Sequence, residues 1–242
     1  MHAEGDITEA SPDPAGSLRA WTPPPAPEAM EIAGRYVRLE PLAESHAPAL
    51  FAANSASDDI WTWLPYGPFA SLAAYRDWLA SVICRPDPRF FAVVPQGGDA
   101  AGVASLMRIN PAHGTIEVGH ICLAPRLQRT RASSEMVFLL ADWCFAAGYR
   151  RFEWKCDAAN RRSRRAAERA GFSFEGVFRN HMVVKGRNRD TAWFAMTDGD
   201  WGCLRPAWTA WLDPANFAPD GRQRQSLGAL TGPCRIAADP GT

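Results

Sequence analysis

Residues 123–136 carry polar and basic side chains directly ahead of a predicted helix. The sequence Gln-Arg-Thr-Arg at 128–131 comes just before a helix that we expect to begin at Ala132. A helix N-terminus has unpaired backbone N–H groups and a partial positive charge, which together with arginine side chains favour binding of a pyrophosphate. The same residues also fit a simpler interpretation, in which Ser and Thr cap the helix and the arginines face solvent.

A second segment whose residues could take part in binding or catalysis is the strand, turn and helix of residues 151–176. A strand is expected to end near Cys156, Asn160 lies in the turn, and the next helix opens near Ser163. The Asn160 amide could bind a ligand through its donor and its acceptor, and the Ser163 hydroxyl could give or take a proton. Without a ligand, Asn160 is a common turn residue and Ser163 an ordinary residue at a helix start.

Two candidate proton acceptors, Glu117 and His120, lie in the predicted strand 115–123. An imidazole with its ordinary pKa of ~6.5 can accept a proton at neutral pH, and a carboxylate can do the same. Alternation along a strand places residues 117 and 120 on opposite faces, so we expect at most one of them to point into a site. A hydrogen-bonded strand histidine and an exposed glutamate would explain both without chemistry.

The apolar pattern predicts the elements that position these residues. Strands at 90–95, 101–110 and 115–123, joined by the turns QGGD and PAHG, indicate an antiparallel meander. After it we expect a helix over 132–147, a strand over 151–156, a helix over 163–170, a strand over 174–184, a turn over 186–190 and a strand over 191–196. Before it come a short strand near 36–39, a helix starting at Pro41 and a helix capped by Ser71.

Both ends of the chain differ from the middle. Residues 1–33 are rich in proline and acidic side chains, which predicts a flexible leader. Residues 34–201 form the expected domain, and 202–242 a C-terminal helix and tail that packs on or beside it. The tail either packs through Trp208, Trp211 and Phe217 or remains partly loose.

Composition places the chain among globular proteins. Its 242 residues are 47% hydrophobic, and 26 basic against 26 acidic side chains give a net charge of +0, so no overall charge attracts nucleic acid or a membrane. A basic cluster around residues 161–165 could contact phosphates, but a solvated helix face explains it as well, and nucleic-acid binding is not expected. The six cysteines show no metal-site spacing, and the N-terminus lacks a signal-peptide pattern. We therefore expect no metal, reduced thiols and a cytoplasmic location.

The two segments together resemble the GNAT superfamily of acetyl-CoA-dependent N-acetyltransferases. The shared features are the meander, the phosphate-loop helix, the order strand, Asn-x-x-Ser, helix and Gly-Phe, and a final hairpin. The closest likeness is to the ribosomal-protein-alanine N-acetyltransferase branch, with NRRSRRAAERAGFSFEGVFR at 160–179 the most specific stretch, and it runs from about Gly34 to Trp201. The resemblance implies an α/β (α+β) fold with a mixed, mostly antiparallel central sheet and flanking helices.

The resemblance also implies a binding site for acetyl-CoA. The acyl-CoA pyrophosphate loop would consist of Gln128, Arg129, Thr130, Arg131, Ala132 and Ser133. Main-chain groups of Ile121, Cys122 and Leu123 would contact the pantetheine arm, and Asn160 would hold that arm from the other side. The family pattern has glycine where this chain has Arg131, and Gly or Ala where it has Ser133, so close approach of the backbone is weakened while the arginine could add charge.

For the reaction, the resemblance implies direct attack of an amine on the thioester. Ser163 would donate a proton to the CoA sulfur, because the tyrosine of many family members is Ala167 here, although water could serve equally. Glu117 matches the acid of the family's E-[IV]-G stretch, and His120 is the other candidate base. The aromatic residues Trp61, Trp63 and Tyr66 would line the acceptor, or else simply pack in the core.

Partners follow from the same resemblance. The acceptor is a small-molecule or peptide amine, including a protein N-terminus, with no membrane partner; a homodimer is allowed. A non-catalytic acyl-CoA-binding or regulatory module is the alternative, favoured by Arg131 in place of glycine and Ala167 in place of tyrosine.

Overall fold

The computed structural model describes residues 18, 20–28 and 30–241. Eight strands form one sheet in the order β1-β2-β3-β4-β5-β6-β8-β7. The strands are β1 (Ile32–Ala33), β2 (Val37–Pro41), β3 (Arg89–Pro95), β4 (Gly102–Asn110), β5 (Thr115–Leu123), β6 (Arg151–Asp157), β7 (Ser173–Val184) and β8 (Arg187–Thr197). Every neighbouring pair is antiparallel except β5 and β6, which run parallel. The predicted mixed, mostly antiparallel sheet is confirmed.

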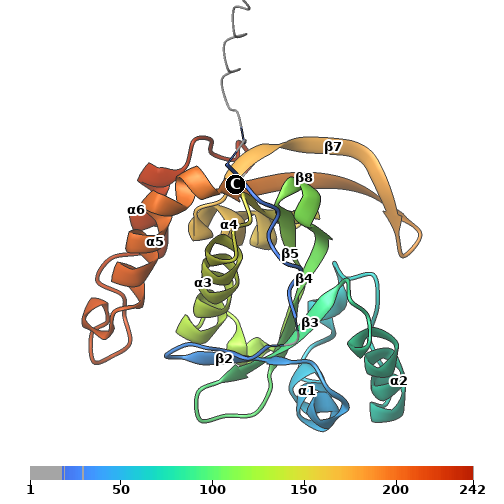
Figure 1. The fold of residues 1–242 in the computed structure, drawn as a ribbon. Coiled ribbons are helices and arrows are strands. Elements are labelled where there is room, and N and C mark those ends of the chain that lie inside the picture. The colour runs from blue at the N-terminus through green and yellow to red at the C-terminus, as the bar shows by residue number, and fades with distance from the viewer. Residues whose placement is uncertain (1–17, 19, 29, 242) are drawn as a thin grey trace, which may run out of the picture.

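Helices cover both faces of this sheet (Figure 1). They are α1 (Ala47–Asn54), α2 (Leu72–Ile83), α3 (Arg131–Ala146), α4 (Arg161–Ala170), α5 (Asp198–Leu212) and α6 (Leu227–Thr231). One hydrophobic core joins the sheet to α3, α4, α5 and α6, and a second joins β3, β4 and the end of β5 to α1 and α2. The sheet therefore has two apolar coverings, and any polar surface on it must lie beside them.

Several predicted element boundaries need correction. The first helix does not start at Pro41, which ends β2; α1 begins at Ala47. Helix α4 begins at Arg161 rather than Ser163, because Asn160 caps it. Most of the predicted turn 186–190 is strand: β8 begins at Arg187, and the turn falls on Lys185 and Gly186, which both have positive φ. Polar residues there resemble a turn because this end of the hairpin extends into solvent and needs no apolar face.

Strand β5 contains a β-bulge that breaks its alternation. Val103 opposes Cys122 and Ser105 opposes Gly119, so β5 has one more residue than β4 between these pairs. His120, within the bulge, has a φ of 51°. As a result Cys122 packs in the α1–α2 core, whereas Val118 packs in the α3 core. The expectation that residues 117 and 120 lie on opposite faces is wrong, because it assumed an unbroken strand.

The C-terminal tail packs on the domain. Trp208 and Trp211 are buried in the α3 core and Phe217 packs against it. Tail residue Asp239 pairs with Arg164 of α4, and the Arg235 guanidinium donates to Glu168 of the same helix at 3.0 Å. The tail therefore braces the helix that carries Asn160 and Ser163.

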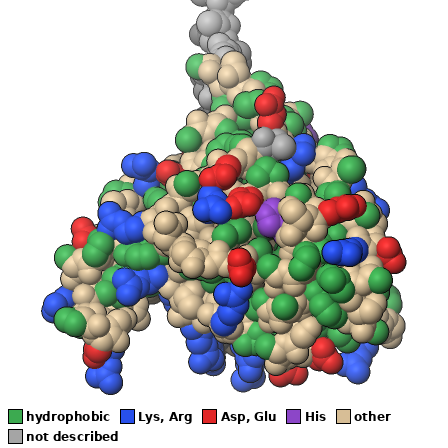
Figure 2. All heavy atoms as spheres, turned by 90° about the horizontal axis from the view of Figure 1, so that it is seen from below, with side chains coloured by type: hydrophobic (Ala, Val, Ile, Leu, Met, Phe, Trp, Pro, Cys, Tyr) green, Lys and Arg blue, Asp and Glu red, His purple; other side chains and the backbone are tan. Residues whose placement is uncertain are grey.

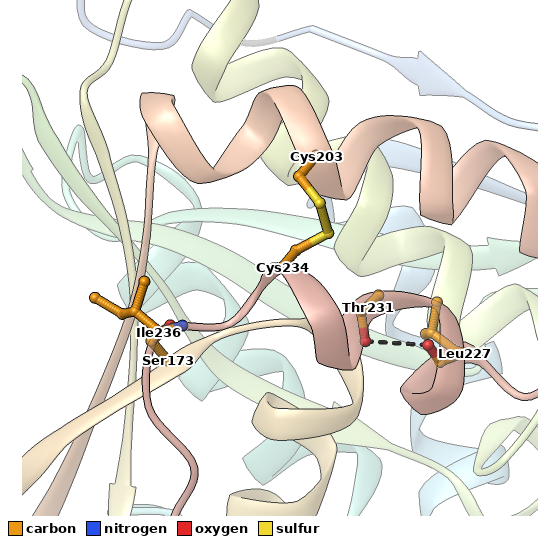
Figure 3. The surroundings of a disulfide bond; sticks show 6 residues. All are labelled: Ser173, Cys203, Leu227, Thr231, Cys234 and Ile236. Carbon is orange, nitrogen blue, oxygen red and sulfur yellow. Dashed lines mark hydrogen bonds between the residues drawn. A yellow bond between two sulfur atoms is a disulfide. The ribbon is translucent and has the colours of Figure 1, made fainter.

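A disulfide between Cys203 and Cys234 ties α5 to this tail (Figure 3). The expectation that the cysteines are reduced thiols is wrong for this pair. Sequence alone missed it because the two residues are 31 positions apart and only the packing of the tail brings them together. The remaining four cysteines are free.

The predicted leader, residues 1–33, falls largely outside the described residues. Its described part contacts the domain: the Trp21 indole N–H donates to the carbonyl oxygen of Gly148 at 3.3 Å, and the Tyr149 hydroxyl donates to that of Pro25 at 3.0 Å. Strand β1 also belongs to this segment and pairs with β2.

The described residues include no helix long and apolar enough to cross a bilayer. Within the same part of the chain, no three His, Cys, Asp or Glu side chains are placed to hold a metal ion. Acidic and basic side chains are interspersed over the face shown in Figure 2, which is consistent with the net charge of +0.

Candidate active site

The N-terminus of α3 combines a side-chain cap with free backbone donors. The Thr130 hydroxyl accepts from the Ser133 N–H at 3.1 Å, and the Ser133 hydroxyl in turn accepts from the Thr130 N–H at 3.2 Å. Among the described residues nothing accepts from the backbone N–H groups of Arg129, Arg131 and Ala132. Capping and anion binding, which the sequence left as alternatives, are therefore compatible at this helix start.

The two arginines of this loop serve different purposes. Arg129 has a φ of 59°, the left-handed conformation that glycine adopts easily, so the loop makes its turn without the glycines of the family pattern. The Arg131 guanidinium lies over the rings of Tyr36 and Phe217, 5.1 and 4.2 Å from their centroids. The positive charge of Arg131 therefore lies over these two rings. At the start of the helix, Arg131 offers an anion only its backbone N–H.

Strands β5 and β6 separate next to this helix start. They pair only from Thr115 with Arg151 to Val118 with Trp154, although β5 continues to Leu123 and β6 to Asp157. Past Val118 the edge of β5 that faces β6 has no strand partner among the described residues. The predicted pantetheine contacts at 121–123 lie on this edge. The Cys122 side chain is buried, which raises the pKa of its thiol to about 12, so only its backbone is suited to a role here.

Asn160 and Ser163 lie on the other side of this separation, at the start of α4. The Asn160 Oδ1 accepts from the Ser163 N–H at 3.1 Å, and nothing in the described chain bonds its Nδ2 donor group. The Ser163 hydroxyl accepts from the Trp154 indole at 3.0 Å and is also within hydrogen-bond range of the buried Cys156 thiol. Both predicted residues are held by local hydrogen bonds.

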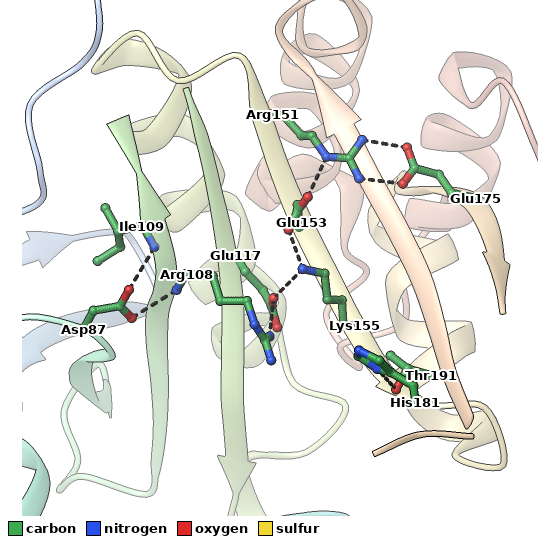
Figure 4. A network of polar contacts seen from close by, with 10 residues as sticks. All are labelled: Asp87, Arg108, Ile109, Glu117, Arg151, Glu153, Lys155, Glu175, His181 and Thr191. Atoms are coloured by element: carbon green, nitrogen blue, oxygen red, sulfur yellow. Dashed lines mark hydrogen bonds and ion pairs between the residues drawn. The ribbon is translucent and has the colours of Figure 1, made fainter. Parts of the chain in front are cut away.

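Glu117 is the centre of a network of ion pairs across β4, β5 and β6 (Figure 4). Its Oε2 accepts from Arg108 Nη1 at 2.6 Å and lies 3.0 Å from Lys155 Nζ. Lys155 also contacts Glu153 at 2.7 Å, and Glu153 continues the network to Arg151. The side chains of Glu117 and Lys155 are only 3% and 5% exposed. The interpretation of Glu117 as an exposed glutamate is wrong.

His120 lies on the same face of the sheet as Glu117. Its ring stacks on Tyr66 at 5.6 Å between centroids and lies 5.0 Å from Phe90. Burial, together with the positive charges of Arg108 and Arg189, lowers the pKa of His120 to about 4. The imidazole is therefore neutral at pH 7, but it is a much weaker base than the sequence suggested.

The predicted acceptor aromatics occupy three different environments. Trp61 is buried in the α1–α2 core, and its carbonyl oxygen accepts from Lys185 Nζ at 2.9 Å. Tyr66 stacks on His120 and faces the sheet surface. Trp63 is 40% exposed. The contact from Lys185 brings the tip of the β7–β8 hairpin to this loop, and Figure 1 shows the hairpin curving toward α1 and α2.

The sequence matches the acetyltransferase (GNAT) domain family over residues 37–173. This chain belongs to the GNAT acetyltransferase family. It is an acetyl-CoA-dependent N-acetyltransferase. The predicted family and enzyme class are thereby confirmed, and the non-catalytic alternative loses its support.

Solved structures of GNAT proteins are similar over most of the chain. A GCN5-related N-acetyltransferase from Brucella melitensis is 48% identical, with a TM-score of 0.87, over 89% of this chain and 100% of that one. A probable GNAT-family acetyltransferase from Chromobacterium violaceum is 40% identical, with a TM-score of 0.73, over 82% and 100% of the two chains. RimL, a ribosomal L7/L12 alpha-N-protein acetyltransferase, shares the fold at 23% identity and a TM-score of 0.60, over 73% and 99%. Comparison with curated proteins gave no match.

The geometry of this GNAT domain fits acetyl-CoA, the cosubstrate of its family. The free N–H groups at the start of α3 suit a pyrophosphate, and the unpaired edge of β5 suits the amide groups of a pantetheine arm. The lack of loop glycines is compensated by the left-handed conformation of Arg129. The fit rests on backbone groups and does not need the arginine charges that the sequence invoked.

Sequence analysis missed several residues that lie around the candidate residue Glu117. Lys155, Arg108, Trp193 and Arg189 were not among the predicted site residues, yet the first two contact Glu117 and Lys155 lies 3.9 Å from the Trp193 ring centroid. A signal for Lys155 was present, because Arg151, Glu153 and Lys155 alternate with apolar residues and therefore share the polar face of their strand. Arg189 carried no signal, since it lay in the segment interpreted as a turn.

Proposed function

We propose that this enzyme acetylates a primary amine by direct nucleophilic attack, with Glu117 accepting the proton of the amine. The observation that carries the proposal is the asymmetry of the Glu117 carboxylate. Arg108 and Lys155 both contact Oε2, and among the described residues no donor bonds Oε1. The free oxygen lies beside Gly119, where β5 and β6 begin to separate: a Cβ built on Gly119 would be 3.6 Å from it. A base there can reach an amine directly or through one water.

His120 is the weaker candidate for the same role. Because the pKa of His120 is about 4, the imidazole would hold a proton too loosely to take one from an ammonium group of ordinary pKa. We assign to His120 the shaping of the acceptor wall, together with Tyr66, on which it stacks. Trp61 then supports this wall from within the core and Trp63 lies at its edge.

Acetyl-CoA supplies the thioester whose acetyl group the amine receives. The N–H groups of Arg129, Arg131 and Ala132 would hold the pyrophosphate, with Gln128, Thr130 and Ser133 shaping the loop. The unpaired edge at 121–123 and the Asn160 Nδ2 group would hold the pantetheine arm. Ser163 would donate its hydroxyl hydrogen to the departing sulfur, and a water is the alternative donor.

The proposed acceptor is either a protein N-terminal α-amine or a small-molecule amine. An α-amine has a pKa of ~7.7–8.0 and needs little help to become neutral, whereas a lysine side chain at ~10.4 requires about 3 kcal/mol more. The likeness to the ribosomal-protein branch supports the N-terminal α-amine, and the geometry described above is compatible with both.

The test is release of free CoA from acetyl-CoA in the presence of a panel of amines, with formation of acetylated amine measured in parallel. We expect amine-dependent release that saturates with both substrates and lacks any burst, since no acetylated enzyme forms. Release that is independent of every amine, or a covalent acetyl group on the protein, would contradict the proposal.

A further inference from the structure

Three buried hydrogen-bond donors near the proposed acceptor lack partners. They are the Arg189 Nε, the Trp193 Nε1 and the Tyr66 hydroxyl, and no described residue accepts from any of them. Leaving a buried polar group without a hydrogen bond costs about 1–3 kcal/mol, so such groups are rare unless something else satisfies them. Three of them in one region indicate that a bound molecule supplies the acceptors.

The three donors border one surface of the sheet. Trp193 opposes Lys155 in the register of β8 with β6, and Arg189 and Trp193 are four residues apart on β8, so both face the side on which Lys155 contacts Glu117. Tyr66 reaches the same surface from the other side, where it stacks on His120. The hydrogen bond from Lys185 to the Trp61 carbonyl oxygen links the β7–β8 hairpin, which carries Arg189 and Trp193, to the loop that carries Tyr66. We call this surface, bordered by Tyr66, His120, Lys155, Arg189 and Trp193, the acceptor face.

Arg189 is the cation of the acceptor face that has no counter-ion. Arg108 and Lys155 are engaged by Glu117, and Lys155 by Glu153 as well. The Arg189 side chain is partly buried, and no carboxylate oxygen of the described residues lies within 4.0 Å of its nitrogens. A partly buried guanidinium without an anion is costly, and a bound carboxylate or phosphate is its usual partner.

We propose that the amine acceptor carries a carboxylate, which Arg189 and Trp193 bind while the amine lies toward Glu117. The inference rests on the proposed function and names the substrate class of the same site. The Arg189 Nε and Trp193 Nε1 groups can only donate, the Tyr66 hydroxyl can donate as well, and a carboxylate accepts up to four hydrogen bonds through its two oxygens. A free amino acid and a peptide whose first residues include an acidic side chain both provide this chemistry.

The experiment compares matched acceptors that differ only in charge. The small-molecule pairs are glycine with glycinamide and β-alanine with β-alaninamide, and the peptide pair is Ala-Asp-Ala-amide with Ala-Asn-Ala-amide. We expect kcat/KM to be at least tenfold higher for the carboxylate member of one pair. A preference within a small-molecule pair identifies a free amino acid as the source, and a preference confined to the peptide pair identifies an acidic N-terminus. Equal or reversed preference in every pair overturns the inference.

Substitutions of Arg189 and Trp193 then test whether these residues bind the carboxylate. In Arg189→Gln the tenfold preference should fall to within twofold, with KM for acetyl-CoA changed less than twofold, because Arg189 is remote from α3. Trp193→Phe keeps an aromatic side chain but removes the indole N–H together with part of the fused ring, so the preference should fall about threefold. The matched control is Arg187→Gln, an exposed arginine near the hairpin turn, which should keep the full preference. A preference that survives in Arg189→Gln excludes this arginine and overturns the inference.

A binding measurement separates this inference from the proposed function. Calorimetry with the acetylated products, N-acetyl-β-alanine and its amide, on the full chain in the presence of CoA requires no turnover. Tighter binding of the carboxylate product, lost in Arg189→Gln, supports the inference even if every amine fails as a substrate. Equal binding of the two products overturns it, whatever the outcome of the turnover assay.

Discussion

The two sides of the proposed active site are built from different kinds of chemical group. The cofactor side, at the starts of α3 and α4 and the free edge of β5, offers mainly backbone N–H groups and one side-chain amide. The acceptor side, on the sheet between β4 and β8, consists of charged and aromatic side chains that contact one another across strands. One side binds through its main chain and the other through its side chains.

This difference has consequences for how each side tolerates change. Backbone donors persist when side chains are replaced, which is how a loop with arginine and serine in place of glycines retains free N–H groups. Charges buried together are interdependent, because removing one partner leaves another unpaired at a cost of several kcal/mol. The acceptor side should therefore be more sensitive to single substitutions and to pH than the cofactor side.

The largest effect is expected for Glu117→Gln. The amide keeps the shape of the carboxylate but cannot accept the proton of the amine, so kcat should fall by at least 100-fold, the usual range for loss of a general base. KM for acetyl-CoA should change less than threefold, because the cofactor side does not use this side chain. Steady-state kinetics with the best acceptor provide both values.

The matched control for this substitution is Glu175→Gln. Glu175 ends the same network, where it receives two hydrogen bonds from Arg151 at 2.7 and 2.5 Å, but it is exposed and distant from the bulge. It should retain kcat within twofold. Equal losses in the two variants would mean that the network as a whole matters and that Glu117 has no separate role.

The second prediction concerns pH and His120. Because the pKa of His120 is about 4 in the folded protein and near 6.5 in the unfolded chain, the unfolded chain binds a proton first as the pH falls. The contribution of His120 to stability is therefore nearly constant above pH 6.5 and decreases toward pH 4, by about 2 kcal/mol between pH 6.5 and 5. Denaturant unfolding at pH 7.5, 6.5 and 5.0 measures this difference.

Asparagine is the substitution of choice at this position, since it tolerates the positive φ of 51° better than most residues. In His120→Asn the loss of stability between pH 6.5 and 5 should shrink by about 2 kcal/mol. The control His113→Asn alters an exposed histidine and should leave the pH dependence as it is. An unchanged pH dependence in His120→Asn would assign the acid sensitivity to other groups.

The cofactor side was the more predictable of the two from sequence. Its groups lie within two short segments, where caps, turn residues and helix starts have local signals, and the family resemblance fell on the same stretches. Most strands and helices were likewise predicted, because period-2 and period-3.6 patterns are local properties.

The acceptor side could not be derived in the same way. The bulge at His120 leaves no mark in the apolar pattern, and without it Glu117 and His120 were assigned to opposite faces. Lys155 and Arg189 reach the site only through the pairing of β5 with β6 and of β6 with β8. Pairing between strands distant in sequence, like the Cys203–Cys234 disulfide, depends on tertiary structure, which one sequence does not display.

A third prediction tests the cofactor side through Asn160. Removing its Nδ2 donor should raise KM for acetyl-CoA about tenfold, the usual value of one hydrogen bond to a ligand, with kcat nearly unchanged. Asn160→Ser is the appropriate variant, because serine still caps α4 and the helix keeps its start. Asn160→Ala removes both the donor and the cap, so comparing their melting temperatures separates binding from stability. An unchanged KM in the serine variant would remove Asn160 from the cofactor site.

The smallest expected effect belongs to Ser163, which lies where the two sides meet. If its hydroxyl protonates the departing sulfur, Ser163→Ala should lower kcat about threefold to tenfold, with KM for acetyl-CoA unchanged. The effect is limited because a thiol is a good leaving group and a water can replace the hydroxyl. The substitution also leaves the Trp154 indole without its acceptor, so Trp154→Phe is needed as a second variant. If both variants lose the same activity, Ser163 acts by holding Trp154; if only Ser163→Ala does, the hydroxyl itself takes part in the reaction.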